Sequence, residues 1–143
     1  MQEELSTFRL NLMRVLYLMM FLFLASTKWP LMIHHREWAQ MEGVAFVFLA
    51  ALGVMAGWGL RYPVKMLPVL LFEFLWKAVW LLAVALPLWR AGHIDPDTAE
   101  TVKATLPAMI ICPLVIPWGY VWRNYVVARG DRWLPVKAGT TTH

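Results

Sequence analysis

The sequence predicts an all-α fold: an antiparallel bundle of four transmembrane helices, forming one membrane domain over residues 1–143. The composition is the first reason, because 60% of the residues are apolar and 15% are charged, whereas soluble domains carry about a quarter charged residues. The second is the presence of four apolar runs separated by polar breaks. Each run is close to the length of about 20 residues that a spanning helix needs. In hydrocarbon every backbone amide needs an internal partner, so four such runs predict a helical bundle.

The first predicted span covers residues 8–29. It resembles a secretory signal peptide in one respect, since Arg14 precedes an apolar core that ends in the small residues 25–27. Glu3 and Glu4, however, remove the basic character from the start of the chain, and no good small-x-small cleavage site follows the apolar core. We therefore expect an uncleaved spanning helix.

The second and third spans are predicted at residues 44–60 and 66–89. Five residues separate them, so the two helices must be neighbours in the bundle. Gly53 and Gly57 form a small-xxx-small ridge on the second span, which lets another helix backbone approach closely. The ridge indicates either packing within the bundle or a homodimer.

The fourth span is predicted at residues 104–127 and is rich in proline. Pro107 fits the first turn of a helix, whereas Pro113 and Pro117 each remove a helical hydrogen bond and should bend or open the segment. Carbonyls freed near residues 114–115 would then face a cavity, a water molecule or a neighbouring side chain.

Residues 95–100 are typical of a helix start. They supply an acidic cap, a proline at the first helical position and acids in the first turn, which predicts a short helix that leads into the fourth span. Together with His93 and residues 34–37, these acids can also be assembled into a divalent-metal site. The spacing matches no metal-ligand motif, so we predict no metal site.

The positions of the charges predict the orientation in the membrane. If both termini face one side, that side carries eight basic residues against three acids, and the other side carries four against five. By the positive-inside rule both termini and the 61–65 turn are cytoplasmic, and no nucleic-acid surface is needed to explain the net charge of +4. The cytoplasmic charges are Arg9, Arg14, Arg61, Lys65, Arg123, Arg129, Arg132, Lys137, Glu3, Glu4 and Asp131; the others are Lys28, Arg36, Arg90, Lys103, Glu37, Glu42, Asp95, Asp97 and Glu100.

Two charges, Glu73 and Lys77, fall inside the third span. Counted from Met66 at about 1.5 Å per residue, they lie about 10 Å and about 16 Å into the membrane. Charges at such depth cost a few kcal/mol each and should face protein or water. Their i, i+4 spacing places them on one helical face, where we expect them to neutralise each other.

Four tryptophans are candidates to line a pocket at this pair. Trp76 and Trp80 border the same face of the third span, and Trp118 and Trp122 are expected to approach from the fourth. Their rings can receive the Lys77 ammonium through cation–π contact, or line a flat pocket for a quinone, a carotenoid-like lipid or an organic cation.

The buried pair has two interpretations. It is either polar glue that fixes the register of the bundle, together with Asn11, Tyr17 or Ser26 from the first span, or a proton- or ligand-responsive site. The single cysteine, Cys112, lies in an apolar run and is expected to be buried and inert.

The sequence contains no phosphate-binding loop, no nucleophile with a base, and no haem-ligand or metal-ligand spacing. We therefore expect a binding or accessory subunit of a membrane complex rather than an enzyme, with a quinone or a lipid as the candidate ligand. One alternative is a proton-coupled transporter that dimerises through Gly53 and Gly57, with Glu73 as the proton carrier. Another is a quinone-associated oxidoreductase subunit, with Lys77 or His34 near the quinone headgroup.

Two stretches resemble those of a known group of proteins. Pro68, Glu73, the Trp76-Lys77 pair and Trp80, followed by the later residues 117–123, look like those of small bacterial inner-membrane proteins of unknown function with a DoxX-like four-helix bundle. The resemblance covers the third and fourth spans. It implies a four-helix fold in the bacterial inner membrane and an association with redox or quinone-linked complexes.

The predicted orientation has a direct test. An alkaline phosphatase fused after residue 137 should be inactive, because the enzyme would remain in the cytoplasm, whereas a fusion after residue 94 should be active. A map that places residue 137 outside the cytoplasm would overturn this topology.

Overall fold

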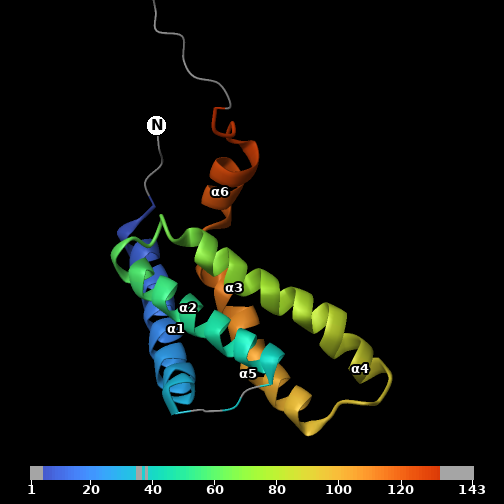
Figure 1. Ribbon diagram of the computed structural model, residues 1–143. Helices are drawn as coiled ribbons and strands as arrows, with labels where there is room; N and C mark the ends of the chain where they lie inside the picture. The colour runs from blue at the N-terminus through green and yellow to red at the C-terminus, as the bar shows by residue number, and fades with distance from the viewer. Residues whose placement is uncertain (1–4, 35–36, 38, 133–143) are drawn as a thin grey trace, which may run out of the picture.

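The computed structural model describes residues 5–34, 37 and 39–132, and every regular element in these ranges is a helix (Figure 1). The predicted all-helical fold class is therefore confirmed. In order the elements are α1 (Thr7–His34), α2 (Gln40–Arg61), α3 (Leu67–Trp80), the π-helical η1 (Leu81–Ala85), α4 (Leu86–Arg90), α5 (Pro96–Val115), α6 (Trp118–Val121) and the π-helical η2 (Trp122–Val127). Predictions that involve Glu3, Glu4, His35, Arg36 or Lys137 lie outside the described residues.

Within these ranges four helical stretches are long and apolar enough to cross a membrane. They are Thr7–His34, Gln40–Arg61, Leu67–Arg90, in which α3, η1 and α4 form one continuous helix, and Pro96–Val115. In Figure 1 the chain runs down α1, back along α2, down α3 and α4, and up α5, after which α6 extends beyond the other helices.

The most tightly packed part of the core lies at one end of the bundle. Its side chains come from the first half of α1, the start of α3 and the end of α5, and we call this region the packed end. Burial of Cys112 is confirmed, since this residue is 1% exposed. Among the described residues, the largest fully buried side chains are those of Met13, Tyr17, Leu67, Leu70, Cys112 and Ile116.

Glycines let α2 approach α1 closely. A Cβ atom added at Gly53 would lie 3.0 Å from the Cβ of Leu24, and one at Gly57 would lie 3.0 Å from the ring of Phe21. The Gly53/Gly57 ridge therefore packs against α1 of the same chain, so α1 covers the face that was considered for a homodimer.

A third glycine makes the closest contact. A Cβ at Gly59 would lie 2.4 Å from the ring of Tyr17, which is 0% exposed. The Tyr17 hydroxyl donates a hydrogen bond to the Pro63 carbonyl at 2.9 Å. This contact ties α1 to the turn between α2 and α3.

Two arginines of α1 complete the packed end. Arg14 Nε donates to the Leu60 carbonyl at 3.2 Å, in the last turn of α2, and an Arg9 Nη donates to the Ile116 carbonyl at 2.9 Å, just after α5. Carbonyls at the ends of helices have no partner within the helix. The arginines supply these partners and connect α1 to the ends of α2 and α5.

The fourth long helix differs from the predicted range of 104–127. It begins at Pro96, because the Asp95 side chain accepts a hydrogen bond from the Thr98 amide at 3.1 Å and caps the first turn. Hydrogen bonds from Thr98 also hold the pKa of the Asp95 carboxyl below its usual range. The short helix expected at 95–100 is therefore the first part of α5 itself.

Proline ends this helix earlier than predicted. Pro107, expected in the first turn, lies in the middle of α5. The helix ends before Ile116 and Pro117, which are not helical. Since Pro117 has no amide hydrogen, the Pro113 carbonyl lacks its helical donor. The Trp118 indole nitrogen donates to that carbonyl at 2.8 Å instead, so a neighbouring side chain satisfies it.

The contact at Gly59 predicts a loss of stability on substitution. Gly59→Ala places a methyl group against the fully buried Tyr17 ring, so the free energy of unfolding should fall by roughly 1–3 kcal/mol, as overpacking does in other cores. The free energy of unfolding is measured by titrating the protein, purified in mild detergent, with a denaturing detergent. Gly119→Ala is the matched control, because nothing lies within 4 Å of a Cβ at that position. Equal stability of the two variants would contradict this account.

Candidate ligand-binding cavity

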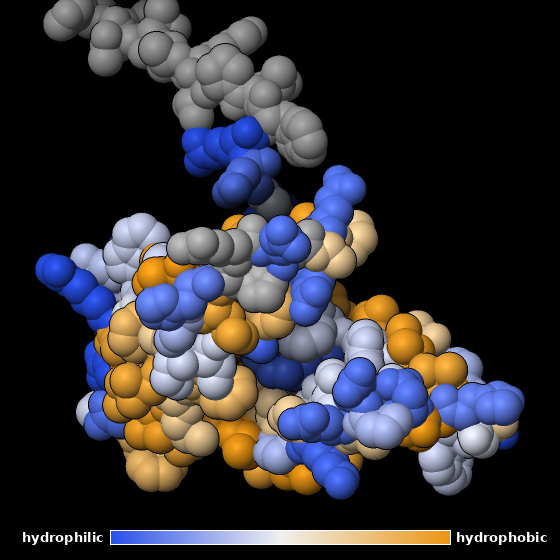
Figure 2. Space-filling model, turned by 60° about the horizontal axis from the view of Figure 1, so that its bottom comes forward, coloured by the Kyte–Doolittle hydropathy of each residue, from blue (hydrophilic) through white to orange (hydrophobic). Residues whose placement is uncertain are grey.

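A cavity of about 640 Å³ lies between α1, α3 and α5, and Leu49 of α2 completes its wall. Its volume is within the range of about 300–1,000 Å³ that is typical of ligand pockets. Figure 2, which brings forward the end of the molecule opposite the packed end, shows a hollow with hydrophilic residues inside it. The apolar lining consists of Leu16, Met19, Met20, Phe23, Leu24, Leu49, Trp76, Ala104, Pro107, Ala108 and Ile111. The polar lining consists of Lys28, Glu73, Lys77, Asp97, Glu100, Thr101 and Thr105.

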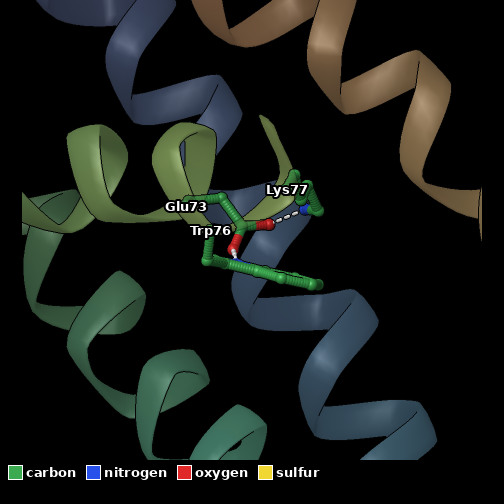
Figure 3. Close-up of polar contacts among 3 residues, drawn as sticks. All are labelled: Glu73, Trp76 and Lys77. Carbon is green, nitrogen blue, oxygen red and sulfur yellow. Dashed lines mark hydrogen bonds and ion pairs between the residues drawn. The ribbon is translucent and has the colours of Figure 1, made fainter. Parts of the chain in front are cut away.

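Three residues of α3 form a polar triad in this wall. Glu73, Trp76 and Lys77 share one helical face because they are spaced at i, i+3 and i+4. One carboxylate oxygen of Glu73, Oε1, forms an ion pair with Lys77 Nζ, and the other, Oε2, accepts a hydrogen bond from Trp76 Nε1 at 2.7 Å (Figure 3). Lys77 Nζ also lies 5.2 Å from the centroid of the Trp76 ring, within the range of cation–π contact.

The two charged residues of the triad are largely buried. The side chains of Glu73 and Lys77 are 8% and 12% exposed. Both oxygens of Glu73 already have donors, whereas the Lys77 ammonium has three hydrogens and gives one to Glu73. Because Lys77 lines the cavity, its other hydrogens can bind an acceptor there.

The structure brings one of the four candidate tryptophans to the cavity, Trp76. Trp80 is half-buried further along α3. Trp118 packs edge-on against Phe74, with ring centroids 5.8 Å apart, and Trp122 is 61% exposed. The interruption of the helix between α5 and α6 explains the difference, because it places Trp118 and Trp122 past the packed end and away from the cavity.

The polar residues of α1 that were considered as partners of the pair bind elsewhere. Asn11 accepts a hydrogen bond from Arg14, Ser26 donates to a backbone carbonyl one turn earlier, and Tyr17 donates to the α2–α3 turn. His34 is exposed at the last residue of α1. The Glu73–Lys77 pair therefore finds its hydrogen-bond partner within α3, in Trp76.

Sequence reasoning missed the polar face of α5. Asp97, Thr101 and Thr105 all line the cavity, and their regular spacing of four residues was the signal that could have found this face. From the sequence, Asp97 is interpreted as part of a helix start and as a possible metal ligand, but not as part of a cavity wall. In the described part of the chain, no group of three or more His, Cys, Asp or Glu residues is placed to hold a metal ion.

No protein-family model, curated protein or solved structure matches the chain. The DoxX-like resemblance therefore remains a prediction from the residues of the third and fourth spans.

The triad predicts strong coupling between Glu73 and Lys77. Glu73→Gln or Lys77→Met alone leaves one buried charge without its partner, which typically costs about 3–5 kcal/mol of unfolding free energy. The double variant removes both charges and should recover most of that loss. Unfolding titrations of the three variants in mild detergent provide the double-mutant cycle.

Trp76→Phe serves as the milder comparison in the same series. It removes the hydrogen bond to Glu73 Oε2 and keeps an aromatic ring, so we expect the free energy of unfolding to fall by about 1.5–3 kcal/mol, the usual contribution of a hydrogen bond to a charged group.

In the double-mutant cycle, additive effects of the Glu73 and Lys77 variants would show that the ion pair contributes nothing to stability.

Proposed function

We propose that this protein is a non-catalytic binding or accessory subunit that holds a small amphiphile inside a membrane helix bundle. The observation that carries the proposal is the largely apolar cavity with the Glu73–Trp76–Lys77 triad in its wall. Apolar cavities with a few well-placed polar groups are the usual form of ligand sites. A quinone or a lipid fits this description.

The proposed binding mode follows from the lining. The Lys77 ammonium donates to an oxygen of the ligand, and the Trp76 ring offers a flat surface beside it. The apolar part of the ligand packs against Met19, Met20 and Phe23 of α1. Glu73 keeps Lys77 oriented and balances its charge.

We further propose that the four long helices form an antiparallel bundle in the bacterial inner membrane, with both termini in the cytoplasm. The charge distribution and the resemblance of the third and fourth spans to DoxX-like proteins support this placement. The cavity would then open away from the cytoplasm, because the packed end contains the cytoplasmic 61–65 turn.

The two alternatives gain less support. A dimeric proton-coupled transporter would need a surface other than the Gly53/Gly57 ridge, because α1 covers that ridge. A quinone-associated oxidoreductase subunit is compatible with Lys77 as the residue near the headgroup. His34 fits this role less well, since it lies outside the residues that line the cavity.

Ligand retention tests the proposal. Protein purified in mild detergent and extracted with organic solvent should release one enriched amphiphile, which mass spectrometry identifies as a quinone or a lipid. Lys77→Met should release at least about tenfold less, since a hydrogen bond from a charged donor is worth roughly 1.5–3 kcal/mol. Lys103→Met is the matched control, because this exposed lysine of α5 lies outside the cavity lining.

A second variant tests the cavity without changing its charges. Ala108→Phe fills part of the cavity and should also displace the amphiphile, whereas Ala83→Phe, at an exposed position of η1, should not. Circular dichroism and size-exclusion chromatography verify that each variant is folded. The proposal fails if no compound is enriched in the wild type relative to Lys77→Met and Ala108→Phe.

A further inference from the structure

We propose that the cavity is a water-filled vestibule, open at the end of the bundle where α5 begins and sealed at the packed end, which admits cations in preference to anions. The inference rests on the membrane placement in the proposed function, but it does not require that an amphiphile be bound. It gives the Glu73–Lys77 pair contact with the solution on one side of the membrane.

A polar path leads along α5 into the cavity. Asp97, Thr101 and Thr105 are four residues apart, so their side chains follow one face of the helix over about 12 Å. Asp97 and Thr101 are exposed, whereas Thr105 is 3% exposed and still lines the cavity. Thr105 lies at the same cavity as Lys77 and Glu73, so the path joins the surface to the triad. A roomy cavity with several polar groups holds water, whereas a purely apolar one stays dry.

The packed end closes the other side of this path. Met13, Tyr17, Leu67, Leu70 and Ile116 are each 0% exposed, and they belong to one cluster of buried apolar side chains. The Tyr17 hydrogen bond to Pro63 and the Arg9 hydrogen bond to Ile116 hold the helix ends together there. Dense packing of this kind leaves no continuous room for water.

The charges of the lining favour cations. Glu73 and Lys77 neutralise each other, which leaves Asp97 and Glu100 against Lys28, a net charge of −1. The Lys28 ammonium lies 4.8 Å from the centroid of the Phe46 ring. Within the described residues neither Asp97 nor Glu100 forms an ion pair. An excess of one sign of charge in a cleft favours ions of the opposite sign, so the net negative lining favours cations.

Cysteine accessibility tests the vestibule. In a Cys112→Ala background, single cysteines are introduced by Thr101→Cys and Thr105→Cys in sealed membrane vesicles of each orientation. Charged, membrane-impermeant methanethiosulfonate reagents should modify both from the side where α5 begins and neither from the opposite side. Relative to the ratio of the same two rates on a small free thiol such as 2-mercaptoethanol, the cationic trimethylammonium reagent should react roughly threefold to tenfold faster than the anionic sulfonate reagent, because of the acids at the opening.

Two matched controls make the result specific. Ile110→Cys lies on the same helix at a position that is 65% exposed on the protein surface but faces lipid in the proposed placement, so the charged reagents should not modify it. Leu70→Cys, at a position that is 0% exposed in the packed end, should also remain unmodified. Denaturation must make both reactive, which shows that each thiol is present. Asp97→Asn with Glu100→Gln should bring this normalised ratio of the two reagent rates close to one.

The outcome is separate from ligand retention. Failure of Thr101→Cys and Thr105→Cys to react, modification of Thr105→Cys from the opposite side, or equal reaction at Ile110→Cys would overturn the vestibule, even if Lys77→Met still loses an amphiphile. Modification of the two threonine sites with a cationic preference would support it, even if no amphiphile is retained. A ratio of the two rates in the unaltered lining no higher than the ratio on the free thiol would overturn the cation preference.

Discussion

The close approach of α1 and α2 determines where the rest of the bundle lies. Glycines on α2 leave room for the side chains of α1, and the Tyr17 ring occupies the space above Gly59. From that position the Tyr17 hydroxyl reaches Pro63 in the turn that leads to α3. The contacts of α1 and α2 thus position the start of α3. They thereby also determine where Glu73, Trp76 and Lys77 lie along the bundle axis.

The two ends of the bundle are built differently because of proline and arginine. At one end Pro117 stops α5, and Arg9, Arg14 and Trp118 satisfy backbone carbonyls that have lost or never had a helical donor. Those bonds hold the helix ends together over a cluster of buried apolar side chains. At the other end α5 begins with a capped turn and acidic residues, and the helices leave the cavity between them.

Helical periodicity and hydropathy were sufficient to predict the fold class, four long apolar helices and a shared face for Glu73 and Lys77. The limits of α5 could not be predicted as well, because its polar first two turns, residues 96–103, lower the hydropathy of a helix that is nonetheless continuous. The positions of Trp118 and Trp122 depend on the break at Pro117, whose direction is set by tertiary contacts rather than by local sequence. The polar face of α5 was not predicted, because the acidic start of a helix already explained Asp97, its first residue.

The hydrogen bonds of Glu73 have a consequence for how the polar wall of the cavity responds to helix movement. Trp76 and Lys77 can only donate, and each already donates to one oxygen of this carboxylate. All three residues belong to α3, so these contacts stay intact when α3 shifts relative to α1 and α5. The polar group in the cavity wall therefore moves with a single helix, and a change in helix packing would alter the width of the cavity without separating the ion pair.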